Sequence, residues 1–168
     1  MEAILSGEET QHGDRVGKAW LVGKSVCRAP HPTEQEVLQE MGVACATLDD
    51  FFRIRINFME CRSEKYALNE DDDVRSDNSH IYTKADQFGT ITSIVKFAPG
   101  GERPTECGLF VQTHNVLSPT VNANHIGKIT GPGPVIFIRP EEVRNLAIKC
   151  SILSDSYIMP MANNFEID

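Results

Sequence analysis

The chain has 168 residues, of which 40% are hydrophobic and 24% are charged, and its formal net charge is −8. This length fits a single domain, and the composition is that of neither a disordered nor a membrane-embedded chain. Because phosphate-backbone binding relies on clustered lysine and arginine, the excess of acids argues against a nucleic-acid partner.

The cysteines and the N-terminus indicate a cytoplasmic, reducing compartment. The five cysteines are an odd number and are widely spaced, which does not resemble a disulfide framework. Residues 1–9 lack the basic region and the apolar stretch of a secretory signal. No apolar run approaches the roughly 20 residues of a membrane span, so we expect no transmembrane segment.

The first elements are an arm and a strand. Residues 1–18 are polar and contain glycines, which predicts a flexible N-terminal arm, followed by a single mainly-β domain over residues 19–168. Residues 20–27 have the aromatic and β-branched character of a strand. Pro30 and Pro32 end this strand, because proline has no backbone N–H for the ladder.

One substantial helix is predicted over residues 33–48. Thr33 and Glu36 form a capping box, and Glu34 and Glu36 suit the positive end of the helix dipole. An apolar stripe follows at spacings of three and four residues, formed by Val37, Leu38, Met41, Ala44, Cys45 and Leu48. Gly42 weakens the middle of this helix and allows a break into two shorter ones.

Residues 52–59 give the clearest strand, because the period changes there from 3.6 to 2. Phe52, Ile54, Ile56 and Phe58 alternate with Arg53, Arg55, Asn57 and Met59. Such alternation places one face in the core and the other in water, which is typical of an antiparallel sheet.

The remaining sequence predicts further short strands and turns. An acidic loop covers residues 69–79, and the strand candidates are residues 80–84, 90–97, 108–116, 134–139 and 146–153. Turns are expected at residues 99–101, 118–120 and 131–134, and a single helical turn at residues 140–143. The fold class is therefore α+β and mainly β, an antiparallel sandwich or partly open barrel of about seven strands with one main helix.

No motif points to a cofactor, a metal or a nucleophile. Residues 17–25 resemble a phosphate-binding loop, but five residues instead of four separate the two glycines, and the segment reads better as a strand. Cys107, His114 and His125 converge on a metal only if their strands are neighbours, and ordinary buried or turn roles are the simpler interpretation. The chain contains neither a Gly-x-Ser-x-Gly motif nor a paired-carboxylate signature, so catalytic residues are not assigned.

Two groups of residues are binding candidates. Arg53 and Arg55 point outward two residues apart, with Arg62 further along, and planar guanidinium groups can grip a carboxylate or phosphate. The simpler alternative is that these arginines keep an exposed strand face in water and pair with local acids. The second group consists of Gln112, His114, His125 and Arg139, which are candidate polar groups of a pocket between sheets.

The function favoured by the sequence is a non-catalytic structural or protein-interaction domain, such as a self-associating assembly subunit, a viral structural protein included. The absence of a catalytic motif and the many short strands, whose edges must be paired or covered, favour it. The alternative is a small-ligand-binding or enzymatic β-barrel with its pocket near His114 and His125. A nucleic-acid binder ranks third, and it requires a basic face built from Arg53, Arg55 and Arg62.

Overall fold

Strands dominate the computed structural model, which describes residues 13–65, 78–117 and 126–161. Its elements in chain order are β1 (Gly13–Val16), β2 (Ala19–Val22), β3 (Val26–Arg28), α2 (Pro32–Glu40), β4 (Leu48–Phe51), β5 (Arg53–Ile56), β6 (Met59–Arg62), β7 (His80–Thr83), β8 (Phe88–Phe97), β9 (Glu106–Leu117), β10 (Gly127–Ile138), the 3-10 turn η1 (Pro140–Glu142), β11 (Val143–Ile152) and β12 (Asp155–Pro160). The predicted fold class, mainly β with one main helix, is confirmed.

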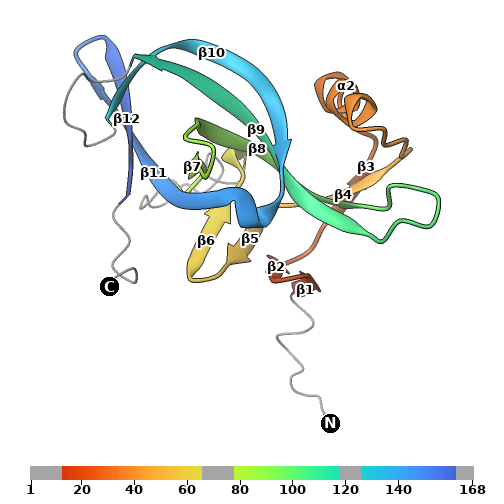
Figure 1. Ribbon diagram of the computed structural model, residues 1–168. Helices are drawn as coiled ribbons and strands as arrows, with labels where there is room; N and C mark the ends of the chain where they lie inside the picture. Colours follow the sequence, from red (N-terminus) through yellow and green to blue (C-terminus); the bar gives the residue numbers. More distant parts are fainter. Residues whose placement is uncertain (1–12, 66–77, 118–125, 162–168) are drawn as a thin grey trace.

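Six of the described strands close into an antiparallel barrel. Their order around the ring is β8-β7-β11-β12-β10-β9, and β9 pairs again with β8. Figure 1 looks into this ring, with β10 along its upper side and β11 along its lower side. The period-two pattern of the sequence therefore corresponds to strands that alternate between two faces of one curved sheet.

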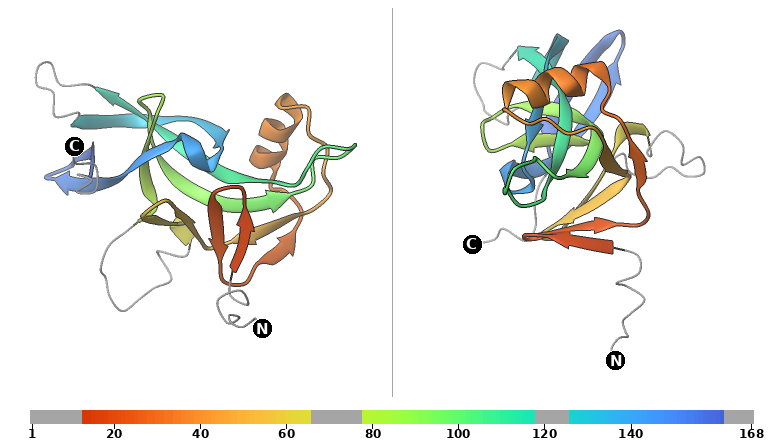
Figure 2. Two further views of the ribbon diagram at one scale, coloured as in Figure 1. Left: turned by 60° about the horizontal axis from the view of Figure 1, so that its bottom comes forward. Right: turned by 90° about the vertical axis from the view of Figure 1, so that its right-hand side faces the viewer.

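A second antiparallel sheet packs against one side of the barrel. Within the described residues it has four strands in the order β1-β2-β5-β6, and the two views of Figure 2 show its β1–β2 hairpin on one side of the long strands β8 and β9. Strands β3 and β4 extend the barrel sheet from β8, and helix α2 packs against β10. The molecule is thus a barrel with a small sheet on one side and a helix at one end.

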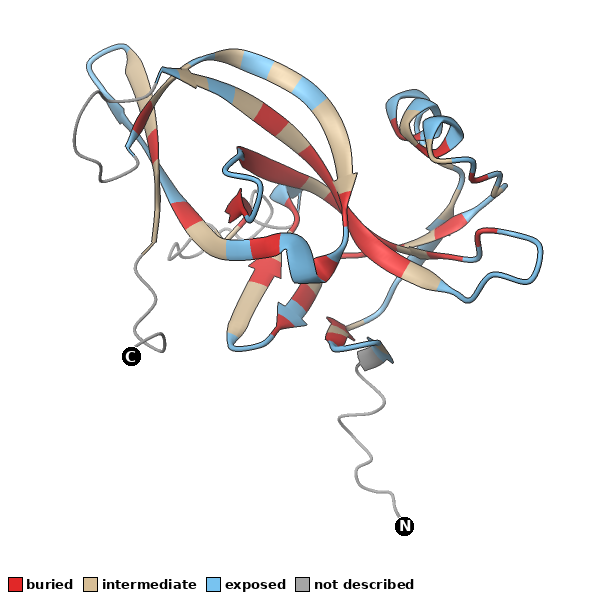
Figure 3. Ribbon diagram, in the orientation of Figure 1, coloured by how far each residue is buried: buried red, intermediate tan, exposed pale blue. Residues whose placement is uncertain are grey.

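The main core lies between the small sheet and the barrel wall. Leu21 and Ile54 of the small sheet pack with Ile94 and Leu109 of the barrel, and all four side chains are 0% exposed. Full burial of such side chains contributes about 1.5–3 kcal/mol each. Figure 3 shows buried positions along β5 and β8, and a separate cluster around Phe110 joins the barrel to α2.

Helix α2 begins earlier than the sequence predicts. Pro32 lies in its first turn, where the missing N–H costs no helical hydrogen bond. The carboxylate of Glu34 accepts a hydrogen bond from the backbone N–H of His31 at 2.8 Å. The predicted capping box of Thr33 and Glu36 is therefore wrong by two residues, because the proline fixes the start of the helix.

The same helix ends at Glu40 and does not continue to Leu48. Gly42 adopts a left-handed φ of 75°, and the N–H of Val43 donates to the carbonyl of Leu38 at 2.9 Å. This bonding closes the helix as in a Schellman motif. Val43 and Leu48 nevertheless share a buried cluster with Leu38, so the helical spacing beyond Gly42 reflects common burial and not a common helix.

Two predicted strands also have different bounds. Residues 20–27 form the separate strands β2 and β3, which belong to different sheets, because Gly23 turns the chain at a φ of 89°. The predicted strand over residues 52–59 ends at Ile56. Asn57, at a φ of 56°, and Phe58 form the turn to β6, and Phe58 is 78% exposed instead of lying in the core.

The predicted turn at residues 131–134 lies inside β10, flanked by register shifts against β9. Proline is accepted there because β10 pairs with β12 only at Gly127 and Lys128, which leaves the other edge of β10 unpaired at its prolines. Residues 13–18, assigned to the arm from sequence, form β1 and its turn. The predicted turn at residues 118–120 and most of the acidic loop lie outside the described residues.

Candidate functional site

The three predicted arginines lie together on the small sheet. Arg53 is paired in register with Arg62, and Arg55 with Glu60, so all four side chains project from the same face of β5 and β6. The opposite face of β5 carries the buried Ile54 and Ile56, which fixes the outward direction of the arginines.

Glu60 holds the three guanidinium groups around one carboxylate. Its oxygens lie 3.6 Å from Arg53 Nη1, 3.6 Å from Arg55 Nη2 and 3.3 Å from Arg62 Nε. The arginine side chains keep exposures of 33%, 53% and 29%, respectively. Three positive charges share one negative charge, so this quartet has a net charge of +2 while the whole chain carries −8.

Two further side chains complete this surface. The register places Arg15 opposite Trp20, and Trp20 opposite Arg55, in one row across the sheet. We call the set Arg15, Trp20, Arg53, Arg55, Glu60 and Arg62 the arginine face. A tryptophan beside guanidinium groups offers a flat contact surface, and the guanidinium forks suit carboxylate or phosphate oxygens.

Glu60 and Trp20 also belong to this face, although neither residue was predicted from the sequence. The available signal was the residue pair Asn57 and Phe58, which forms a two-residue hairpin turn. A hairpin at that position pairs Arg55 with Glu60. A single strand over residues 52–59 leaves no turn at Asn57 and Phe58, so the pairing of Arg55 with Glu60 was not predicted.

The second predicted group is only partly brought together. Gln112 and His114 lie two residues apart on β9, and Gln112 Nε2 donates to the carbonyl of Gly133 at 2.6 Å. Arg139 follows Ile138, which is opposite Leu109, five positions along β9 from His114. Five positions correspond to about 17 Å of strand.

Arg139 therefore belongs to a different part of the barrel from Gln112 and His114. Its Nη2 lies 2.8 Å from Glu106 Oε1. His125 lies outside the described residues.

His114 belongs to a chain of hydrogen bonds between two imidazoles. The hydroxyl of Thr90 lies 2.8 Å from His114 Nε2 and 2.9 Å from His80 Nδ1. One hydroxyl has one proton, so at least one imidazole donates an N–H to the threonine oxygen. Burial, with smaller contributions from Lys149 and His80, lowers the pKa of His114 to about 4, so His114 is neutral near pH 7.

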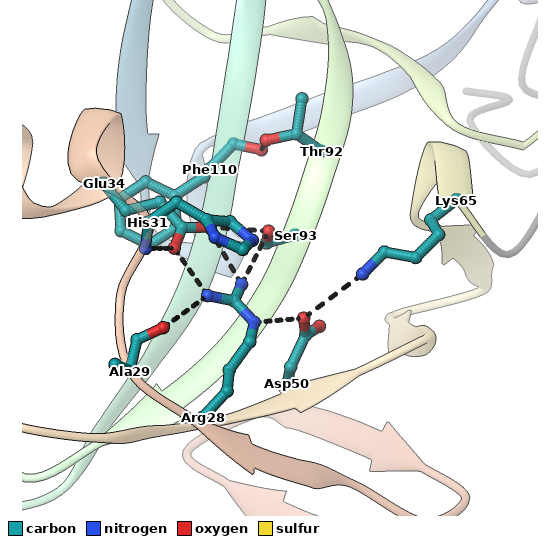
Figure 4. Close-up of polar contacts among 9 residues, drawn as sticks. All are labelled: Arg28, Ala29, His31, Glu34, Asp50, Lys65, Thr92, Ser93 and Phe110. Carbon is teal, nitrogen blue, oxygen red and sulfur yellow. Dashed lines mark hydrogen bonds and ion pairs between the residues drawn. The ribbon is translucent and has the colours of Figure 1, made fainter.

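A largely buried polar cluster surrounds Arg28, and no motif in the sequence indicates it (Figure 4). Arg28 donates to Glu34 through Nη1 at 2.8 Å and Nη2 at 3.0 Å, and to Asp50 through Nε at 2.8 Å. Ser93 donates to Glu34 at 2.7 Å. These bonds join α2 to β3, β4 and β8, so the cluster fixes the helix against the sheet.

Glu34 is the central acceptor of this cluster and is only 4% exposed. Burial alone raises the pKa of its carboxyl group. Hydrogen bonds from Arg28, from the backbone N–H of His31 and from Ser93 outweigh burial, so the pKa lies below its usual value. An ionised, fully bonded carboxylate of this kind has a structural role and offers no accessible atom to a substrate.

The described residues contain no group of three or more histidine, cysteine or acidic side chains placed to hold a metal ion. Cys107 and His114 lie on the same strand, seven residues apart. None of the five cysteines, all of which lie within the described residues, forms a disulfide, and burial, with a contribution from Glu60, raises the pKa of the Cys61 thiol to about 12. In the part of the chain that the structure describes, no helix combines the length and the apolar character needed to cross a membrane.

The outer face of β11 and β12 carries an apolar groove. Its volume is about 360 Å³, and its lining residues are Ile126, Ile148, Cys150, Ile152, Tyr157, Ile158 and Met159. Ile152 is 57% exposed, and Leu153 in the adjoining turn is 97% exposed. The ion pair between Lys128 and Asp155 lies beside the groove.

The fold and these sites define the chain as a β-barrel domain with an arginine-bearing accessory sheet. The sequence matches no protein-family model, and no curated protein sequence or solved structure matches it either. Any assignment of function therefore depends on the chemistry of the surfaces described above.

Proposed function

We propose that this chain is a non-catalytic interaction domain that binds an acidic, extended segment of a partner protein on its arginine face. The observation that carries the proposal is the arrangement of Arg53, Arg55 and Arg62 around Glu60 on an exposed sheet surface. Glu60 contacts all three guanidinium groups, and the four side chains together carry two more positive charges than negative ones.

The geometry of β5 favours an extended polypeptide as the ligand. Arg53 and Arg55 are two residues apart on one strand, which is about 6.7 Å. Acidic side chains at alternate positions of an extended segment repeat at the same spacing. The net charge of −8 opposes the long-range attraction that nucleic-acid binding needs, so the local face suits a short acidic segment better than a long polyanion.

The test measures the binding of a fluorescein-labelled (Glu-Ser)6 peptide by fluorescence anisotropy at low salt. Hydrogen bonds to charged groups contribute about 1.5–3 kcal/mol each, so Arg55→Ser lowers the affinity about tenfold or more. Glu60→Gln raises the affinity, because it removes the carboxylate that competes for the three guanidinium groups.

The matched control removes three cations on the barrel strands β10 and β11, away from the arginine face, with Lys128→Ser, Arg144→Ser and Lys149→Ser. This triple variant retains peptide affinity, whereas the variant with Arg53→Ser, Arg55→Ser and Arg62→Ser loses it. Equal losses in both triple variants refute the site. If a single-stranded 20-nucleotide DNA binds more tightly than the peptide, the partner of the arginine face is a nucleic acid and not a protein segment.

The predicted self-association has a separate candidate surface in the apolar groove of β11 and β12. We propose a second copy of the chain as its occupant. The groove lining has no charged side chain, so two copies that each carry −8 repel least where these surfaces meet. Paired outward residues, such as Ile148 opposite Met159 and Cys150 opposite Tyr157, give each copy the same apolar strip, as a two-fold contact requires.

Light scattering behind a sizing column tests this second proposal over a wide concentration range. The chain is expected to form dimers that Ile148→Asp dissociates, while the control Phe58→Asp, at an exposed position in the β5–β6 turn, leaves the dimers intact. A bismaleimide cross-link through the exposed Cys150 is expected in the wild type and in Phe58→Asp, and it is expected to be absent from Ile148→Asp and from Cys150→Ser. A monomer at every concentration refutes self-association and leaves the arginine face untouched.

A further inference from the structure

A pocket of about 590 Å³ lies between the small sheet and the barrel. One wall comes from the β1–β2 and β5–β6 turns, and the other comes from the start of β9 and from η1. Its volume falls in the range of about 300–1,000 Å³ that is typical of small-molecule sites. The pocket is separate from the arginine face, because its lining contains none of that face's residues.

The pocket combines an apolar wall with basic side chains. Its apolar lining residues are Val16, Ala19, Ile56, Cys107 and Pro140. Lys18, Lys84 and Arg139 come from three separate segments of the chain, and Glu106 and Glu141 are the acids. The segments are distant in sequence and meet only through the packing of the small sheet on the barrel.

The charges in this pocket are not equivalent. Arg139 Nη2 lies 2.8 Å from Glu106 Oε1, so these two groups neutralise each other. Among the described residues, Lys18 and Lys84 have no ion-pair partner within 4.0 Å. Two ammonium groups therefore remain against the single carboxylate of Glu141, and the pocket has a net charge of +1.

The β1–β2 and β5–β6 turns, which form one wall of the pocket, have restricted backbones. Gly17 has a φ of 63° and Asn57 a φ of 56°, both in the left-handed region, and both residues line the pocket. Tight turns of this kind hold the adjoining Lys18 and Ile56 at fixed places on the rim and the wall. The site thus offers a preformed apolar surface beside two cationic groups.

We propose that this pocket binds a small ligand with an apolar body and one anionic group, a carboxylate, phosphate or sulfonate. The apolar body packs on Ala19 and Ile56, and the anion lies between the ammonium groups of Lys18 and Lys84. The proposal is independent of the arginine face and goes beyond the interaction function, because it assigns a separate small-molecule site. No covalent step is involved.

The probe for this site is 8-anilinonaphthalene-1-sulfonate, which has an apolar body and one sulfonate. We expect one molecule to bind per chain with enhanced fluorescence. The double variant Lys18→Glu and Lys84→Glu is expected to weaken binding of the probe at least about tenfold, because it replaces two attractive charges by two repulsive ones. Both lysines are exposed, so the substitutions leave the fold intact.

Two controls separate this site from the apolar groove of β11 and β12. The double variant Lys24→Glu and Arg144→Glu makes the same charge change elsewhere, and it is expected to bind the probe like the wild type. The uncharged analogue N-phenyl-1-naphthylamine is expected to bind equally to the wild type and to the Lys18→Glu, Lys84→Glu variant. Unchanged binding of the sulfonate by that variant, or an equal loss in the control variant, overturns the proposal.

Displacement of the bound probe identifies the source of the anionic group. Decanoate represents a free amphiphile, and acetyl-Ala-Ala-Leu with a free carboxyl group represents the C-terminus of a protein. Displacement by either compound supports the proposal and assigns the source, provided that decanol and the peptide amide displace the probe at least tenfold less well. Displacement by neither acid overturns it.

Discussion

Replacing Arg28 by methionine tests the view that its cluster fixes helix α2 to the sheet. The substitution removes the guanidinium group and retains a flexible apolar side chain. Arg28 bonds to both Glu34 and Asp50, whose exposures are 4% and 5%. Arg28→Met therefore leaves two buried carboxylates without their main cationic partner.

The expected loss of unfolding free energy follows from this geometry. Removing one partner of a buried ion pair costs about 3–5 kcal/mol. Lys65 Nζ lies 3.9 Å from Asp50 Oδ2 and compensates part of the loss, which favours the lower value of about 3 kcal/mol. For a domain of this size each kcal/mol lowers Tm by about 2–4 °C, so we expect a decrease of about 10 °C.

Urea denaturation and thermal unfolding measure this loss, with Arg144→Met as an exposed control that changes stability by less than about 0.5 kcal/mol. The pH dependence gives an independent readout. In the wild type the lowered pKa of Glu34 stabilises the fold above the pKa of the unfolded chain, and this contribution is lost as the pH falls through the folded pKa. Arg28→Met leaves burial as the main effect on Glu34, so the variant loses less stability between pH 7 and pH 4. A variant within 1 kcal/mol of the control, with the pH slope of the wild type, refutes the structural role.

Three other predictions follow from groups described above. The pKa of His114 in the fold is about 4, below its value in the unfolded chain, so the fold loses stability as the pH falls from about 6.5 to 4. His114→Gln is expected to reduce this dependence of the unfolding free energy on pH, as measured by urea denaturation at successive pH values. Gly108→Ala places a methyl group against the Phe137 ring and destabilises the fold by about 1–3 kcal/mol, whereas Gly131→Ala, with open space at that position, has little effect on the urea midpoint. In the native protein a thiol reagent such as DTNB modifies Cys150 rapidly and Cys61 only after unfolding, and equal rates contradict the burial of Cys61.

Much of the strand content could be predicted because alternation depends on local sequence. Ile54 and Ile56 alternate with Arg53 and Arg55, and the structure buries the first pair and exposes the second. The 3-10 turn at Pro140 could also be predicted from the sequence, because proline favours a first helical turn. These features need no information about distant residues.

The errors occurred where tertiary packing decides the local structure. Leu48 has helical spacing from Leu38, yet it begins strand β4, because both side chains enter one cluster from different elements. The segment at Pro132 has turn residues, yet β10 accepts it because its other edge is unpaired there. Neither outcome follows from propensity alone.

The candidate sites divide in the same way. Arg53, Arg55 and Arg62 could be named because outward arginines on a strand are visible in the sequence. The pocket of Lys18 and Lys84 could not, because 66 positions separate the two lysines and only the packing of two sheets brings them to one cavity. The same holds for the contact of Arg28 with Ser93, which are 65 positions apart.

The order of the elements divides the polypeptide into two consecutive halves with different tasks. Every strand of the ring comes from the second half, β7 to β12, whereas the helix and the accessory sheet come from the first half. The ring alone therefore has a wall with Ile81, Ile94 and Leu109 uncovered, and the first half supplies the apolar side chains that shield it. Two separately expressed fragments, divided near residue 70, are therefore expected to associate through these apolar side chains. The domain is accordingly suited to split-reporter designs, in which reassembly of the fragments is the signal.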